Sequence, residues 1–553
     1  MTRSAKMAAG GALLALPYAP FALGWTPGGG GAGVVLVCVA ALVAPGAAGM
    51  LLPGSAGTAG RFVRALGVAA VLQIAAIGVL RIAGVQPTPR TLAIALGAIT
   101  VATGLVGVGR GGTLPGLRRN AAAVAVAAAA FTLAAWAGLA VVPPLEDQDM
   151  EVQGTAWGIV HDLDPVCLTN RSTLRFFAHP PLLHLLNATT LSLSGELDAV
   201  RSAYDAARAA ERGEGDAPRG LRAVAGAIRG KTPRPDRSLA WNRDVYAAFR
   251  THPALAGTRA PNFVLAAAVA VLLFAWGRRL GAGVFDAALV TLAYATLPEV
   301  VVRSGYGGYY ALTAATLTAG AWLASERAGG GRAAFSAGTL AALANQKALL
   351  LALGAAAGRM AEAVRARNPR LLRAAFPAVL GVAAGWAAFA LYGLGTDPVE
   401  FVTDHLLGHG VGRFAGGEVL DRAGSPTYPG RIALWGEFAA HLGWAWTLLA
   451  AFSLVWVFRA WIAHAAAARA LLLPAVWVAA GAVLFTLTDW RQTKHLCLLV
   501  PALAVLMAAL VADSGLRVRW LLRSALFLSL AHNAYWMVRL AENFHSLAPT
   551  PLW

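Results

Sequence analysis

Residues 121–151 read AAAVAVAAAAFTLAAWAGLAVVPPLEDQDME, an uncharged apolar run followed directly by a cluster of acids. An uncharged helix of about 20 residues spans the ~30 Å hydrocarbon core of a bilayer. Four carboxylates then fall within the six residues 146–151, where the chain leaves the lipid. Carboxylates repel one another, and the C-terminal end of a helix disfavours acids. The cluster therefore predicts a cation, a metal or a substrate that needs a base at this membrane surface, and a solvated helix end is the alternative.

The composition of the chain is that of a membrane protein. Of its 553 residues, 58% are hydrophobic and 13% are charged, whereas soluble domains carry about 25% charged residues. The apolar runs are continuous rather than alternating, which favours helices over a β-barrel. We therefore expect an all-α polytopic membrane protein, a helical bundle of about 13 to 15 membrane helices with a periplasmic loop domain.

The net charge of +18 is explained by arginines that gather on one side of the membrane, as the positive-inside rule predicts. Membrane lipids are a second partner of these arginines, and no nucleic-acid partner is expected. The Ala-, Gly- and Arg-rich composition suggests a bacterial protein, which we expect in the inner membrane, and the positive-inside orientation places the acidic cluster on the periplasmic face.

The apolar runs divide the chain into consecutive parts. They are four additional N-terminal helices (1–119), a first core helix (120–143), a large outer loop domain (144–259), membrane helices with a re-entrant break near 345–347 (260–396), a second outer loop (397–435) and C-terminal membrane helices (436–553).

The re-entrant break resolves a conflict in charge. Arg332 precedes the apolar segment 333–358, and five arginines follow it within 359–373. A single crossing would place these arginines on opposite faces. Two half-helices, 333–345 and 347–358, avoid this and direct Lys347 toward an outer cavity, since polar backbone at membrane depth must line protein or water. A plain span with a snorkelling lysine is the alternative.

A cationic patch lies late in the chain, where Arg491, Lys494 and His495 precede the apolar run 496–513. Cations at a helix N-terminus oppose its dipole unless an anion binds there. Because Arg and Lys are the usual phosphate ligands, the patch predicts phosphate binding, against the alternative of interfacial snorkelling. Together with Lys347, these residues form the predicted donor-phosphate site.

The acidic cluster supplies the complementary chemistry. A carboxylate beside other carboxylates has a raised pKa, which suits a general base. Asp147, Glu146 and Asp149 are therefore the candidate catalytic residues. Whether a divalent cation such as Mg or Mn takes part stays open; Asp147 and Asp149 would hold it.

Two further polar elements are candidates for lining the acceptor site. His179 stands in the run AHPPLLH at 178–184, where a structural turn is an equal alternative. Glu299, Arg303 and Tyr306 belong to a polar turn between two spans, although interfacial tyrosines are usually membrane anchors.

The order of these motifs resembles the GT-C class of membrane glycosyltransferases, in particular protein O-mannosyltransferases and the aminoarabinose transferase-like family. The resembling pieces are Glu146–Asp147 after a membrane helix, His179–Leu182, Arg259–Pro261 at a helix start, the polar break 345–347, and Lys494–His495 before a helix containing Pro501. The acidic pair is reversed from the family's usual Asp-Glu order, and the four N-terminal helices have no counterpart in this pattern.

The resemblance implies an inverting transfer of a hexose or pentose from a polyprenyl-phosphate donor to a lipid, glycan or protein acceptor outside the cytoplasm. Asp147 would then be the base, and Lys494 and His495 would hold the donor phosphate. A transporter or flippase of a lipid-linked glycan is the alternative, although that activity would need cationic groups along a path through the membrane.

Overall fold

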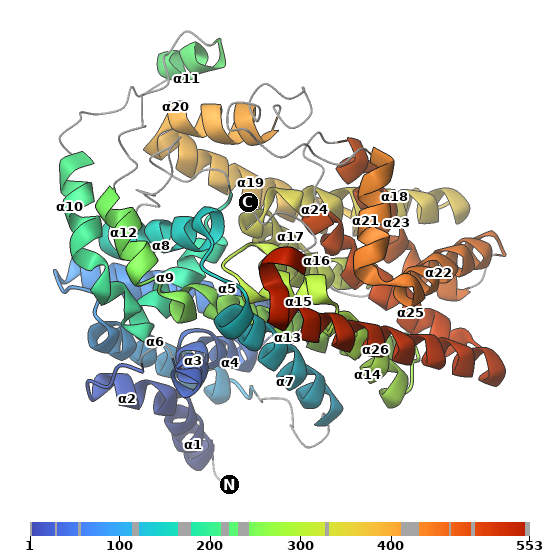
Figure 1. Ribbon diagram of the computed structural model, residues 1–553, viewed down its shortest axis with the longest axis horizontal. Helices are drawn as coiled ribbons and strands as arrows, with labels where there is room; N and C mark the ends of the chain where they lie inside the picture. Colours follow the sequence, from blue (N-terminus) through green and yellow to red (C-terminus); the bar gives the residue numbers. More distant parts are fainter. Residues whose placement is uncertain are drawn as a thin grey trace.

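The structure is a computed structural model, and it describes residues 3–27, 30–53, 57–112, 121–163, 179–211, 221–229, 243–326, 331–410, 431–463, 466–487 and 493–547. Every regular element within these ranges is a helix (Figure 1). The predicted all-α fold class is confirmed.

Eight helices in the described part of the chain are long and apolar enough to cross a membrane, or nine when the bent pair α14 (Val284–Ala295) and α15 (Pro298–Gly305) counts as one span. The two helices of this pair meet at 65°. The sequence prediction of about 13 to 15 spans is higher because it also counts shorter or more polar helices, among them Met7–Ala22, Leu471–Leu487 and α26 (Leu516–Leu547).

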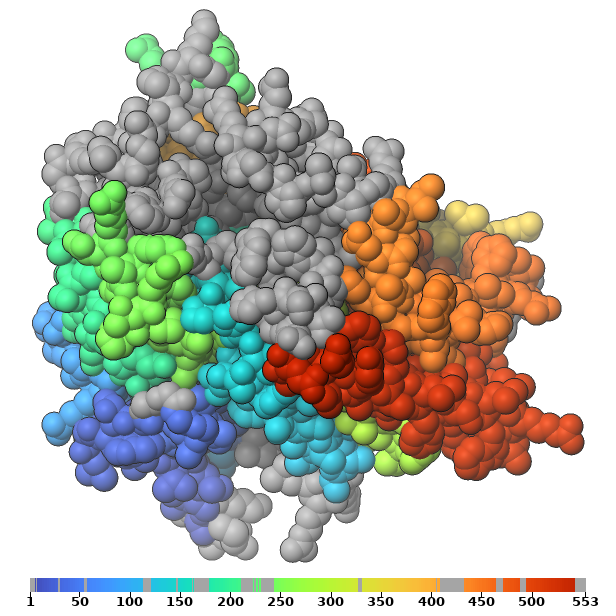
Figure 2. All heavy atoms as spheres, in the orientation of Figure 1, coloured from blue at the N-terminus to red at the C-terminus, as the bar shows by residue number. Residues whose placement is uncertain are grey.

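The N-terminal helices pack on one another and form one corner of the molecule, blue in Figure 2. Buried polar contacts join them: the Tyr18 hydroxyl lies 3.1 Å from that of Thr100, and the Gln73 amide donates to the Ala41 carbonyl at 2.8 Å. Their bounds are α1 (Arg3–Ala15), α2 (Ala19–Ala22), α3 (Gly31–Cys38), α4 (Ala44–Leu51), α5 (Thr58–Ile82) and α6 (Pro89–Gly109).

A small aromatic cluster lies in the segment that follows α7 (Ala121–Trp136). Trp157 stacks on Tyr204 with ring centroids 5.6 Å apart, and Phe249 and Met150 are buried in the same cluster. This cluster joins α8 to α10 and α12, whereas α9 is buried in the main hydrophobic core and α11 contacts residues 398–410. The bounds are α8 (Glu151–Asp162), α9 (Leu182–Ser194), α10 (Arg201–Glu211), α11 (Leu221–Ile228) and α12 (Arg243–Thr251).

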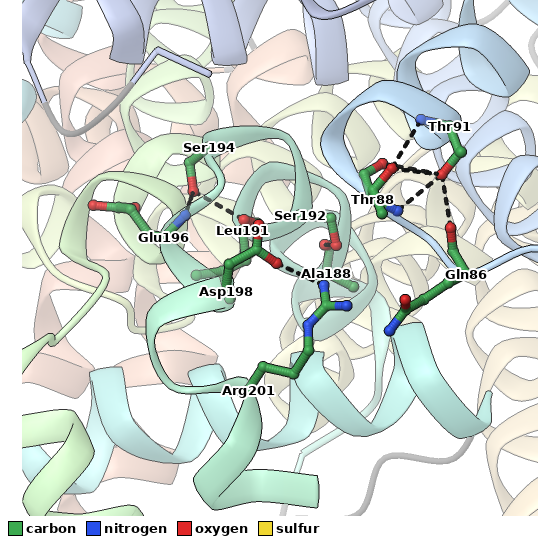
Figure 3. A network of polar contacts seen from close by, with 10 residues as sticks. All are labelled: Gln86, Thr88, Thr91, Ala188, Leu191, Ser192, Ser194, Glu196, Asp198 and Arg201. Atoms are coloured by element: carbon green, nitrogen blue, oxygen red, sulfur yellow. Dashed lines mark hydrogen bonds and ion pairs between the residues drawn. The ribbon is translucent and has the colours of Figure 1, made fainter. Parts of the chain in front are cut away.

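The end of α9 is fastened by its own polar side chains (Figure 3). Ser194 Oγ donates to the Leu191 carbonyl at 2.9 Å and accepts from the Glu196 N–H at 3.3 Å. Gly195 takes the left-handed conformation (φ +75°) that ends the helix. A Cβ at this position would lie 3.4 Å from the Thr26 methyl group. The Glu196 carboxylate accepts from the Gly257 N–H at 2.7 Å, so the end of α9 is tied to α13 (Leu255–Arg279).

The chain reverses direction at residues 345–348. Helices α17 (Gly331–Ala344) and α19 (Phe376–Thr396) run parallel, because Phe335 lies against Gly381 and Thr339 lies against Gly385. The helix between them, α18 (Leu349–Arg365), must therefore run in the opposite direction. In agreement, the Arg359 guanidinium near its C-terminal end donates to the Ala324 carbonyl at the end of α16 (Tyr310–Ser325), close in sequence to the start of α17. The break contains Asn345, whose side chain accepts from the Lys347 N–H at 3.0 Å.

The remaining helices complete the second half of the bundle, orange and red in Figure 1. The central one is α25 (Val500–Asp513), which is buried along most of its length. The others are α20 (Pro398–Phe401), α21 (Arg431–Leu442), α22 (Trp444–Ile462), α23 (Ala466–Leu487) and α24 (Thr493–Leu496).

Candidate active site

Arg259 in α13 organises the end of the first core helix. Its guanidinium donates to the carbonyls of Val142 and Pro143, each at 2.7 Å, and to that of Gly138. The last carbonyls of a helix have no partner within the helix, and a cation suits this negative end. Arg259 therefore fixes where the membrane helix ends and the acidic turn begins.

The same guanidinium holds Asp149. Its Nε and Nη2 bond the two carboxylate oxygens at 3.0 and 2.5 Å, and both side chains are fully buried. Asp149 Oδ1 also accepts from the Gly307 N–H at 2.8 Å, and Oδ2 accepts from the Leu145 N–H at 3.0 Å. Each carboxylate oxygen thus accepts two hydrogen bonds, so Asp149 is positioned as a structural anchor with both oxygens already engaged.

The glycine turn 305–308 lies directly against the acidic segment. The Asn262 amide donates to the carbonyls of Tyr306 and Gly308 at 2.6 and 2.7 Å. A Cβ on Gly307 would lie 2.7 Å from Asp149 Oδ1, and one on Gly305 would lie 2.9 Å from the Gly138 nitrogen. Only glycine allows the backbones of α7 and α15 to approach this closely.

His179 and His184 both contact Tyr309, the residue that follows this turn. The ring of Tyr309 lies 4.2 Å from that of His179, centroid to centroid, and its hydroxyl is hydrogen-bonded to Nε2 of the buried His184. The predicted acceptor residue His179 therefore lies at the same turn as Tyr306, and the structure adds His184 and Tyr309 to the site.

We expect His184 to make the fold acid-sensitive. Burial lowers the pKa of His184 to about 3 from 6.5, so below pH 6.5 the unfolded chain binds a proton that the folded chain does not. The free energy of unfolding should fall as the pH drops, by about 2 kcal/mol at pH 5. Thermal unfolding of the detergent-purified protein at pH 7.5 and pH 5 measures this loss. His184→Gln should lose less stability between the two pH values than the wild-type protein; an equal loss in both proteins would contradict the assignment.

The predicted residues Glu299, Arg303 and Tyr306 form one buried cluster. The Arg303 guanidinium donates to the Glu299 carboxylate at 2.7 Å and to the Tyr306 hydroxyl at 3.3 Å. The Cys497 thiol lies against the Glu299 carboxylate, and the Tyr310 hydroxyl donates to the Cys497 carbonyl at 3.2 Å. This cluster connects the turn at Asp149 to Cys497, which lies two residues after His495 at the start of the span Lys494–Asp513.

Lys347 and the Lys494–His495 pair belong to helices that meet on α23. A Cβ on Gly481 would lie 2.3 Å from a Leu499 methyl and 3.7 Å from a Leu350 methyl. Leu350 follows Lys347 by three residues, and Leu499 follows His495 by four. His495 is buried with its ring 5.7 Å from that of Phe485, whereas Lys347 and Lys494 are half-buried. Lys347 and the pair Lys494–His495 thus lie at the start of two helices that both pack on α23.

Part of the predicted site lies outside the described residues. The backbone of Glu146 and Asp147 lies in the π-helical turn Glu146–Met150, but their side chains and the whole of Arg491 are not described. Within the described part of the chain, no group of three or more His, Cys, Asp or Glu side chains is arranged to hold a metal. The metal and the role of Asp147 stay predictions.

The second outer segment contributes a structural histidine. His405 is buried, and its ring lies 4.9 Å from that of Phe389 and 5.3 Å from that of Phe401. In the sequence His405 and His409 have the i, i+4 spacing that metal ligands take on a helix, but the aromatic surroundings of His405 favour a packing role.

Comparisons with known proteins add one distant similarity. No family model and no curated protein sequence matches this chain. Among solved structures, the crystal structure of ArnT from Cupriavidus metallidurans bound to undecaprenyl phosphate is similar, with a TM-score of 0.46 and 14% sequence identity. The match covers 74% of this chain and 62% of that one, so this chain spans less than two thirds of that protein's length. A similarity this distant carries no argument about activity, which depends instead on the residues described above.

Proposed function

We propose that this chain is a membrane glycosyltransferase that moves a sugar from a polyprenyl-phosphate donor to an acceptor hydroxyl, with inversion at the anomeric carbon. The observation that supports this most is the buried path that runs from Asp149 to Gly307, through the adjacent Tyr306 to Arg303 and Glu299, and on to Cys497. It connects an acidic turn and a cationic helix start that are distant in the sequence.

Each end of this path would supply one part of the reaction. The acceptor oxygen forms a bond to the anomeric carbon and loses its proton to Asp147. The bond from the anomeric carbon to the phosphate oxygen breaks, and polyprenyl phosphate leaves with the electron pair. Lys494 and His495, with Lys347 and Arg491, would bind that leaving phosphate and stabilise its developing charge.

Asp147 is the preferred base because the structure gives Asp149 another task. The two oxygens of Asp149 are occupied by Arg259 and two backbone N–H groups. Glu146 is the alternate base that this geometry leaves open. His179, Tyr306 and the buried pair Glu299–Arg303 would shape the acceptor side. A divalent cation would have to bind through Asp147, since Asp149 is held by a guanidinium.

The test uses purified protein and a polyprenyl-phosphate sugar labelled in the sugar. Because neither sugar nor acceptor is known, we would screen hexose and pentose donors and measure the release of free polyprenyl phosphate. Turnover that depends on added acceptor supports the proposal. Translocation of the labelled lipid across vesicles without any turnover would favour the flippase.

Lys494 offers a sharper test once turnover is measured. We expect Lys494→Met to lower kcat/KM about 10- to 100-fold, because a charge-assisted hydrogen bond to the leaving phosphate is lost. Lys494→Arg should retain most activity, and the exposed Arg517→Met in α26 is a control for charge alone. Unchanged kcat/KM in Lys494→Met would remove Lys494 from the donor site.

A further inference from the structure

A large groove lies between the N-terminal helices and the rest of the bundle. Its volume is about 1450 Å³, and α5, α8, α9, α17 and α19 line it. Small-molecule pockets measure about 300–1,000 Å³, so this groove exceeds the size that a sugar or nucleotide needs. Among the candidate catalytic and phosphate-binding side chains that the structure describes, which are Asp149, Lys347, Lys494 and His495, none lines it.

The lining of the groove is apolar along its length. Along α5 it extends from Gly60 to Ile74, which are 14 residues apart and therefore separated by about 21 Å at 1.5 Å per residue. Val71, Leu182 and Leu340 are typical of its walls. Such a long apolar surface fits hydrocarbon chains.

One end of the groove is basic. Arg64 in α5 and Arg332 in the first turn of α17 line it there, beside Gly60 and Gly331. The nearby acid Glu326 is already paired with Arg279. The groove is therefore an apolar surface with two arginines, from separate parts of the chain, at one end.

We propose that this groove binds an anionic glycerophospholipid, with the phosphate at Arg64 and Arg332 and the acyl chains along α5 and α17. Arginine is suited to phosphate through its several N–H donors, and anionic headgroups attract basic residues at the membrane surface. The bound lipid would fill the seam between the N-terminal helices and α17. This inference does not depend on the proposed transferase activity.

The experiment measures lipid binding to the purified full-length protein by native mass spectrometry. We expect phosphatidylglycerol to bind at least tenfold more tightly than phosphatidylcholine with the same acyl chains. Arg64→Gln combined with Arg332→Gln should weaken phosphatidylglycerol binding about thirtyfold, and Arg332→Gln alone about fivefold. Because Arg64 also donates to the Leu52 carbonyl, the single variant at the exposed Arg332 keeps the test valid if the double variant does not fold.

Three controls define the outcome. The double variant Arg459→Gln with Arg517→Gln removes two exposed arginines that do not line the groove, and it should leave binding unchanged. Arg332→Lys should retain most binding, and Ser336→Trp should weaken it by filling the groove. Equal binding of the two phospholipids, or wild-type affinity in Arg332→Gln, would overturn the proposal. So would tighter, arginine-dependent binding of polyprenyl phosphate, which would assign the groove to the carrier lipid.

Discussion

Replacing Asp147 by asparagine is expected to lower the turnover of the purified protein by about 10²- to 10⁴-fold, the usual contribution of a general base. The amide keeps the size of the carboxylate and loses its basicity. Because the neighbouring Asp149 is already held by Arg259, it cannot readily replace Asp147 as the proton acceptor. Turnover is measured as the release of polyprenyl phosphate.

The matched control is Glu146→Gln, the same change at the adjacent residue. We expect it to lose much less activity, and both variants should keep the wild-type melting temperature because the Asp149–Arg259 anchor is left intact. Full activity in Asp147→Asn would refute the assigned base. A large loss confined to Glu146→Gln would transfer the role to Glu146.

Replacing Arg259 by methionine should have the largest effect on stability. It leaves the Asp149 carboxylate buried without its counter-charge, and removing one partner of a buried ion pair costs about 3–5 kcal/mol. Most proteins are stable by only about 5–15 kcal/mol. The same change also leaves the carbonyls of Gly138, Val142 and Pro143 without their donor. We therefore expect low yield and a strongly lowered melting temperature.

The reciprocal variants separate this structural role from chemistry. Asp149→Leu alone should also destabilise, because it leaves the Arg259 charge buried. The double variant Asp149→Leu with Arg259→Met should be less destabilised than the sum of the two single changes, since no unpaired charge remains. Thermal unfolding in detergent measures all three. Single variants as stable as the wild-type protein would show that the pair is no anchor.

The fold class was predictable because the hydropathy of a segment depends only on the residues of that segment. The long uncharged run at 121–142 and the arginine distribution indicate helices and their order without any tertiary information. The number of spans was less predictable. Helix α16 is only 16 residues long, and a short buried helix and a membrane span have the same apolar pattern.

The site was only partly predictable, for a physical reason. Clusters of like charge, such as residues 146–151, are visible because they are unfavourable without a partner. The pairing itself is not visible: Arg259 belongs to a motif that the sequence indicates only as a helix start, and it lies 110 residues after Asp149. Asn262 and Gly307 act through backbone contacts that leave no pattern in sequence. His184 could have been found from its place in the His-Pro-Pro element, but its bond to Tyr309 depends on the fold.

The central claim is that the acidic turn and the Lys494–His495 helix start serve one site, and a cryo-EM structure with bound polyprenyl phosphate tests it most directly. We predict the phosphate within hydrogen-bond distance of Lys494, with the Asp147 side chain facing the same cavity. A phosphate bound elsewhere, with Asp147 and Lys494 opening to separate cavities, would contradict it.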